Sequence, residues 1–137
     1  MVPEVGQRAR EWLDLDGSAP ALRALRAEAR RHLAASGVAE PIVGDALVVL
    51  SELVRNGLAA SGDRPLSCSV SVTDAVVAVE VTNPWAHARA VPDFGPGVGA
   101  PGDPVAGFGL PVVSVLAVRL RVDLGEGYTV VRAELLR

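Results

Sequence analysis

Glu52 and Asn56 are the polar side chains whose type and spacing are best suited to chemistry. They lie four residues apart in residues 41–60, where apolar residues recur at helical spacing, so both should lie on one face of a helix. The helix is apolar almost all round and should be largely buried, so a carboxylate and an amide within it need polar partners. Either they face a cavity that holds a polar ligand, or they form a solvent stripe with an internal hydrogen bond.

Most of the remaining sequence reads as short regular elements around this helix. Residues 7–15 predict an edge strand or an extended arm, and residues 20–36 predict an amphipathic helix that begins after Ser18. Alternating residues predict an antiparallel hairpin from 66–73 and 76–82, and a second pair of strands at 119–124 and 128–136. A helix is expected at about 109–118. This order predicts an α+β fold, a two-layer sandwich with a mainly antiparallel sheet covered on one face by three helices.

Residues 91–107 interrupt this pattern, because they contain five glycines and four prolines. A loop of this length within a small domain is usually functional or disordered. We therefore expect a cover over a site, a long Gly/Pro lid at about residues 84–107, within a single domain that spans residues 1–137.

Composition excludes several classes of function. The net charge of −3 argues against a protein that binds nucleic acid through its backbone charge. All 13 basic side chains are arginine, which excludes P-loop, protein-kinase and Schiff-base lysines. No apolar run is long enough to span a membrane and no signal peptide is recognisable, so we expect a cytoplasmic protein without a membrane partner.

Three single residues have simple interpretations. Cys68 is expected to be a buried or half-buried strand residue and not a nucleophile, because no histidine is placed beside it. His32 and His87 are expected to be solvated. The arginines at Arg23, Arg26 and Arg30, with Arg31 beside them, form either a solvated helix face or a docking surface for an acidic partner.

Three ordered motifs lie at Ser51–Asn56, at Gly107–Leu110 and at residues 125–135. Together they resemble those of the histidine-kinase-like (GHKL, Bergerat-fold) ATPase domains, and most closely the actinobacterial stand-alone anti-sigma-factor serine kinases. Residues 51–56, Ser-Glu-Leu-Val-Arg-Asn, match the N-box of that family. Gly107-Phe108-Gly109-Leu110 matches its second glycine box. Residues 125–135, which include Thr129, match its closing hairpin.

The resemblance implies a role for each matching residue. Glu52 would be the general base, and Asn56 would bind the Mg²⁺ that bridges the phosphates of ATP. Gly107, Phe108, Gly109 and Leu110 would form the phosphate-binding segment, at a helix N-terminus that favours anions. Thr129 would reach adenine from the sheet.

The adenine-side position departs from the family pattern. Asn83 stands 27 residues after Asn56, where the family has an aspartate, and Pro84 and Trp85 follow it. Asp93 is the alternative, because residues 93–97 fit the pattern Asp-x-Gly-x-Gly. Residues 57–60 also lack the basic residue or histidine that relatives often carry near the phosphates.

Two functions are compatible with this resemblance. The first is a regulatory ATP-dependent protein serine kinase that sequesters a sigma factor and phosphorylates an anti-anti-sigma (STAS-type) partner, without contacting nucleic acid. The second is a module that has kept the fold but acts by protein contact, with weak or no ATP binding. Relatives commonly form homodimers, for which the first strand and helix could serve.

Overall fold

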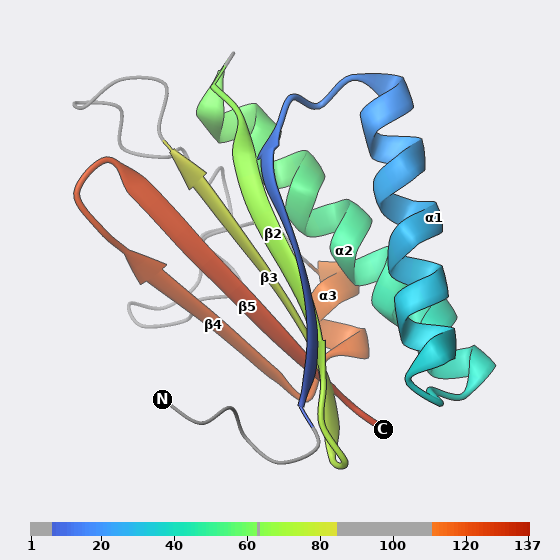
Figure 1. Cartoon of the computed structure of the whole chain (residues 1–137). Coiled ribbons are helices and arrows are strands. Elements are labelled where there is room, and N and C mark those ends of the chain that lie inside the picture. Colours follow the sequence, from blue (N-terminus) through green and yellow to red (C-terminus); the bar gives the residue numbers. More distant parts are fainter. Residues whose placement is uncertain (1–6, 63, 85–110) are drawn as a thin grey trace.

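The computed structural model describes residues 7–62, 64–84 and 111–137. In this part of the chain, five antiparallel strands form one sheet in the order β1-β2-β3-β5-β4. The helices lie on a single face of that sheet (Figure 1). Helix α2 packs against the central strands, and α1 packs against α2 and the edge strand β1. The elements are β1 (Arg8–Leu15), α1 (Ala19–Ala35), α2 (Glu40–Ser61), β2 (Leu66–Val72), β3 (Val76–Pro84), α3 (Pro111–Leu116), β4 (Arg119–Leu124) and β5 (Tyr128–Leu136). The α+β sandwich expected from the sequence is confirmed.

The core lies between α2 and the middle of the sheet. Alternate residues of each strand face the helices, and they form one continuous cluster with the inner side of α2. Val70 and Val79 are register partners on neighbouring strands, and Val79 also opposes Ala133 on β5. All three are at most 1% exposed. The alternation read from the sequence therefore places the correct strand faces inward.

Strand β1 contains an irregularity that turns two large side chains to the same side. Trp12 pairs with Cys68 and Leu15 pairs with Leu66, with a register shift between them. Asp14 has a φ of 54°, which accommodates the extra residue. Trp12 and Leu15 are three residues apart and would face opposite sides of a regular strand, but both pack against the core cluster.

Glu28 of α1 ties that helix to the edge strand. Its carboxylate accepts a hydrogen bond from Trp12 Nε1 at 2.9 Å and pairs with Arg10 at 3.1 Å. Arg10 also lies over the Trp12 ring, 5.3 Å from its centroid. Together with the antiparallel pairing of β1 and β2, this contact shows that residues 8–15 form an edge strand of the sheet and not an extended arm.

Most element ends lie within one residue of the sequence prediction, but the ends of β3 and α3 differ from it by two residues. Strand β3 continues through Asn83 to Pro84, because these residues still pair with Thr129 and Tyr128 of β5. Helix α3 ends at Leu116 rather than at residue 118, because the backbone N–H of Val118 donates to Glu134 O of β5 at 2.8 Å. The helix thus ends two residues earlier than the apolar pattern suggests, whereas β4 begins at Arg119 as predicted. The predicted lid, beyond Pro84, lies outside the described residues.

His32 corrects a second expectation, because it is half-buried rather than fully solvated. It lies three residues after Ala29 and seven after Leu25, on the buried side of α1. Its Nε2 atom is buried without a hydrogen-bond partner in the described part of the chain. Burial lowers the pKa of His32, with a smaller contribution from the nearby charges of Arg10 and Arg8; the backbone of Arg8 and of Val70 opposes this shift.

We expect acid to destabilise the fold through His32. Because its folded pKa lies below 6.5, the unfolded chain binds a proton first. The free energy of unfolding should therefore fall as the pH drops below about 6.5 and through the lower folded pKa. Urea titrations between about pH 7.5 and 5.5 should show a smaller decrease for His32→Leu than for the unmodified chain. His87→Gln is the matched control, and an equal slope for all three proteins would contradict the assignment.

Among the described helices, none combines the length and apolar character needed to cross a membrane.

Candidate functional site

Asn83 and Thr129 form a buried polar pair on the helix-facing side of the sheet. They are register partners at the end of β3 and near the start of β5. Asn83 is 4% exposed and Thr129 is 1% exposed, although their neighbours on this side of the sheet are apolar. Two polar residues, of the types expected from the sequence, therefore lie together in an otherwise apolar layer.

Gly57 brings helix α2 against this pair. A Cβ atom added to Gly57 would lie 3.2 Å from Leu66, 3.3 Å from Val81 and 3.4 Å from Asn83 Cβ. The lack of a side chain at this position lets the helix backbone approach β3 closely. Asn56, the residue before Gly57, is thereby held close to the end of β3 where Asn83 stands.

Asn56 has its amide group oriented by its own helix. Its Nδ2 atom donates to the backbone oxygen of Glu52 at 2.9 Å. The internal hydrogen bond considered in the sequence analysis therefore exists, but it uses the Glu52 backbone and not the carboxylate. This bond leaves the amide oxygen of Asn56, a ligand type that Mg²⁺ accepts, directed away from the helix backbone.

Glu52 is paired with Arg55, a partner that the sequence analysis did not name. The Glu52 carboxylate accepts a hydrogen bond from the Arg55 guanidinium, one helical turn later. The Glu52 side chain is 26% exposed and that of Arg55 is 74% exposed, so the pair lies at the solvent boundary. The three-residue spacing on a helix was the available signal for this contact.

The remaining predicted site residues lie outside the described part of the chain. These are Asp93, Gly107, Phe108, Gly109 and Leu110. Helix α3 begins directly after them at Pro111 and packs beside α2. The structure thus places Asn83 opposite Thr129 and against Gly57, the residue after Asn56. Glu52 lies one helical turn before Asn56, at the solvent boundary.

Comparison with known proteins identifies this arrangement. Residues 17–135 match the family described as histidine kinase-like ATPase domain, which includes α2 and both strands that carry the buried polar pair. The chain belongs to the histidine kinase-like ATPase domain family. The resemblance inferred from the N-box and the glycine box is therefore confirmed at the level of family.

A solved structure supports the same fold for this histidine kinase-like ATPase domain. The crystal structure of the RsbU and RsbW domains of Rv1364c from Mycobacterium tuberculosis aligns with a TM-score of 0.66 and 20% sequence identity. The alignment covers 95% of this chain and 33% of that chain, so the present chain spans about a third of the longer protein. The likeness shows that this chain shares its fold with part of that protein. No curated protein matches the chain in sequence.

Other metal or thiol chemistry has no support within the described residues. No group of three or more His, Cys, Asp or Glu side chains there could hold a metal ion. Burial raises the pKa of the Cys68 thiol to about 12, so it stays protonated and unreactive near neutral pH. Cys68 is a buried strand residue, as the sequence analysis expected.

Substitution of two glycines in α2 should test the close approach at Gly57. A Cβ at Gly44 meets nothing within 4 Å, so Gly44→Ala should raise the free energy of unfolding by about 0.5–1 kcal/mol through helix propensity. Gly57→Ala gains the same propensity but forces its Cβ against Leu66, Val81 and Asn83, so the expected gain is absent or reversed. Urea denaturation of both variants decides the matter. Equal stabilisation by both would show that α2 does not need a glycine there.

Proposed function

We propose that this domain binds ATP with Mg²⁺ and transfers the terminal phosphoryl group to a serine of a regulatory protein partner. One observation carries the proposal, namely the packing of Gly57 on Asn83. It sets the N-box residue Asn56 beside the buried Asn83–Thr129 pair. A helix that carries a metal-binding amide thus meets a sheet that carries a polar pair suited to a heterocyclic base.

Asn83 and Thr129 are the proposed adenine contacts. The Asn83 amide oxygen can accept a hydrogen bond from the 6-amino group, and its amide nitrogen can donate to a ring nitrogen. Both residues are nearly inaccessible to water, which strengthens such hydrogen bonds. The bond is neutral where the family's aspartate makes a charge-assisted one, so we expect weaker binding than in relatives with that aspartate.

Asn56 and Glu52 are the proposed groups at the phosphate end. The orientation of the Asn56 amide leaves its oxygen for Mg²⁺, which supplies charge neutralisation of the phosphates when bound. Gly107, Phe108, Gly109 and Leu110 remain sequence-based candidates for phosphate binding. Glu52 is partly exposed, so a partner's hydroxyl can reach its carboxylate and lose a proton to it.

The partner we propose is a sigma factor, an anti-anti-sigma (STAS-type) protein, or both, within the partner-switching control of transcription. The protein would act in the cytoplasm as a single ATPase domain, alone or as a homodimer. The support is the family membership together with the anti-sigma-factor-kinase type of fold.

A second candidate function is protein binding without catalysis. Two observations favour it. The adenine-side position holds a neutral Asn83, and the Glu52 carboxylate is already paired with Arg55. Weak or absent nucleotide binding would leave the fold to act by contact with its partner alone.

Calorimetric titration with Mg-ATP separates these two functions. We expect binding in the unmodified protein and at least tenfold weaker binding in Asn83→Ala, because both adenine hydrogen bonds are lost. Thr82→Ala is the matched control, since Thr82 precedes Asn83 on the opposite side of β3. The absence of heat at millimolar Mg-ATP would reject the kinase proposal and leave the binding module.

Glu52→Gln should separate binding from chemistry. The amide keeps the size of the side chain but cannot take a proton, so Mg-ATP should bind as before while phosphoryl transfer falls by a factor of about 10² or more. Single-turnover assays with radiolabelled ATP and the cognate partner measure this step. Undiminished transfer would show that another group is the base.

A further inference from the structure

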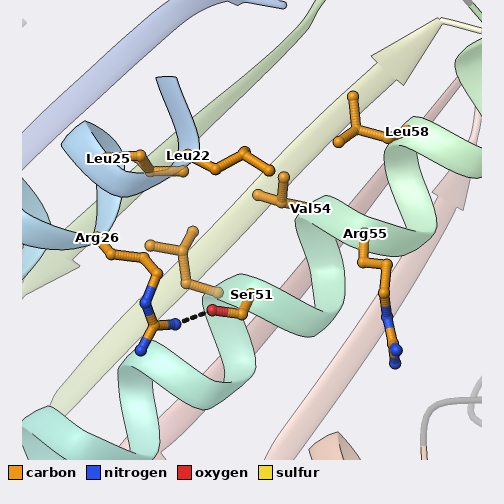
Figure 2. Close-up of a pocket in the computed structure, with 8 residues that line it drawn as sticks. Leu22, Leu25, Arg26, Ser51, Val54, Arg55 and Leu58 are labelled. Carbon is orange, nitrogen blue, oxygen red and sulfur yellow. Dashed lines mark hydrogen bonds between the residues drawn. The ribbon is translucent and has the colours of Figure 1, made fainter. Parts of the chain in front are cut away.

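A cavity of about 350 Å³ lies between α1 and α2 (Figure 2). Its volume falls within the range of ligand and side-chain pockets. Five aliphatic side chains form its floor, namely Leu22, Leu25, Leu50, Val54 and Leu58. The surface is therefore an apolar recess that a protein can fill with side chains but that water hydrates poorly.

Two guanidinium groups stand at the rim of this cavity, with Ser51 between them. Figure 2 shows the charged ends of Arg26 and Arg55 on the same side of the aliphatic cluster. Arg26 donates to Leu47 O at 3.2 Å and to the Ser51 hydroxyl, so α2 holds its position. The recess thus combines an apolar floor with two guanidinium groups at one edge, of which Arg26 is held by α2 and Arg55 is paired with Glu52.

Helix α1, which lines one side of the recess, is basic although the chain as a whole is acidic. It carries four arginines on exposed positions, namely Arg23, Arg26, Arg30 and Arg31, of which Arg30 pairs with Glu40 at 2.7 Å. Its one acidic residue, Glu28, is engaged with Arg10 and Trp12 of β1. With a net charge of −3 for the whole chain, this concentration of arginine marks a surface complementary to an acidic partner.

We propose that the α1–α2 recess binds an acidic amphipathic helix of a protein partner. Apolar side chains of that helix fill the floor, and a carboxylate beside them meets Arg26 and Arg55, as in other helix-in-groove interfaces. A nucleic acid does not fit the recess, because phosphates and sugars cannot cover an aliphatic floor. The proposal rests on the proposed function only in taking a protein partner to be what the domain acts through.

Arg55 links this recess to the candidate catalytic group. It lines the cavity and is also the ion-pair partner of Glu52. A carboxylate of the bound helix competes with Glu52 for the same guanidinium. Docking therefore loosens the Glu52–Arg55 pair, and removal of the Glu52 charge makes Arg55 more available to the partner.

The test uses a defined peptide without nucleotide, so its outcome is independent of ATP binding. The probe is a capped 16-residue helical peptide with leucines at i, i+4 and i+7 flanked by glutamates. One twin has lysine in place of glutamate, and another has alanine in place of leucine. Amide chemical shifts are followed in the ¹⁵N-labelled domain. We expect the largest shifts at Leu22, Ser51 and Val54, with no binding by either twin.

Charge variants then locate the contact. Arg26→Gln and Arg55→Gln should each weaken peptide binding about fivefold, whereas Glu52→Gln should tighten it about twofold to threefold. The double variant Arg23→Gln/Arg31→Gln is the matched control, and it should change the affinity by less than about twofold.

Three results would overturn the proposal. These are shifts that miss the recess, equal binding by the lysine or alanine twin, or a loss in the control as large as that for Arg26→Gln. Tighter binding of a single-stranded oligonucleotide than of the peptide would assign the arginines to nucleic acid instead.

Discussion

The close approach of α2 to β3 at Gly57 is the constraint on which the candidate site depends. A helix that packs on a sheet through ordinary side chains keeps its backbone well away from the strands. The missing Cβ of Gly57 removes that separation at the point where Asn83 ends the apolar part of β3. The N-box amide of Asn56 and the buried Asn83–Thr129 pair therefore belong to one region, although 73 residues separate Asn56 from Thr129 (129 − 56). This contact brings motif residues that are far apart in the sequence close together in space.

Helix α2 serves two surfaces at once. One side faces the sheet and carries Asn56 towards Asn83. A second side of α2, which includes Ser51 and Val54, lines the recess with α1. Arg55 contacts both, through its ion pair with Glu52 and through its place at the rim. In the proposed function, this single helix would connect partner binding with phosphoryl transfer through one exchangeable ion pair, without movement of the core.

Helices and strands whose apolar residues recur at a regular spacing were predictable from the sequence. Contacts between segments that are distant in the sequence were not. The alternation of residues 66–73 and 76–82 is enough to define the hairpin and its buried side, and helical spacing is enough to define α2. His32 was misplaced because a histidine followed by an apolar residue looks exposed, whereas its spacing from Leu25 and Ala29 turns it inward. The end of β3 at Pro84 depends on pairing with Tyr128, and the recess depends on how α1 lies on α2, so neither has a local signal.

The site was predictable to the extent that family motifs mark it. Glu52, Asn56, Asn83 and Thr129 were named from sequence, and the structure brings Asn56, Asn83 and Thr129 together through Gly57 and the β3–β5 register. Arg55 was not named, because a motif defines which residue types recur and not which charges meet. The neutral Asn83 is expected to weaken adenine binding, because it replaces a charged hydrogen-bond acceptor with a neutral one.

Selective labelling of asparagine tests the central claim most directly. The chain contains two asparagines, Asn56 and Asn83, so a ¹⁵N-asparagine sample reports on these two positions alone. Addition of Mg-ATP should shift the side-chain amide signals of both residues, and the two signals should saturate at the same nucleotide concentration. If the signals do not move, or if Asn56 shifts while Asn83 does not, then α2 and β3 do not share one nucleotide.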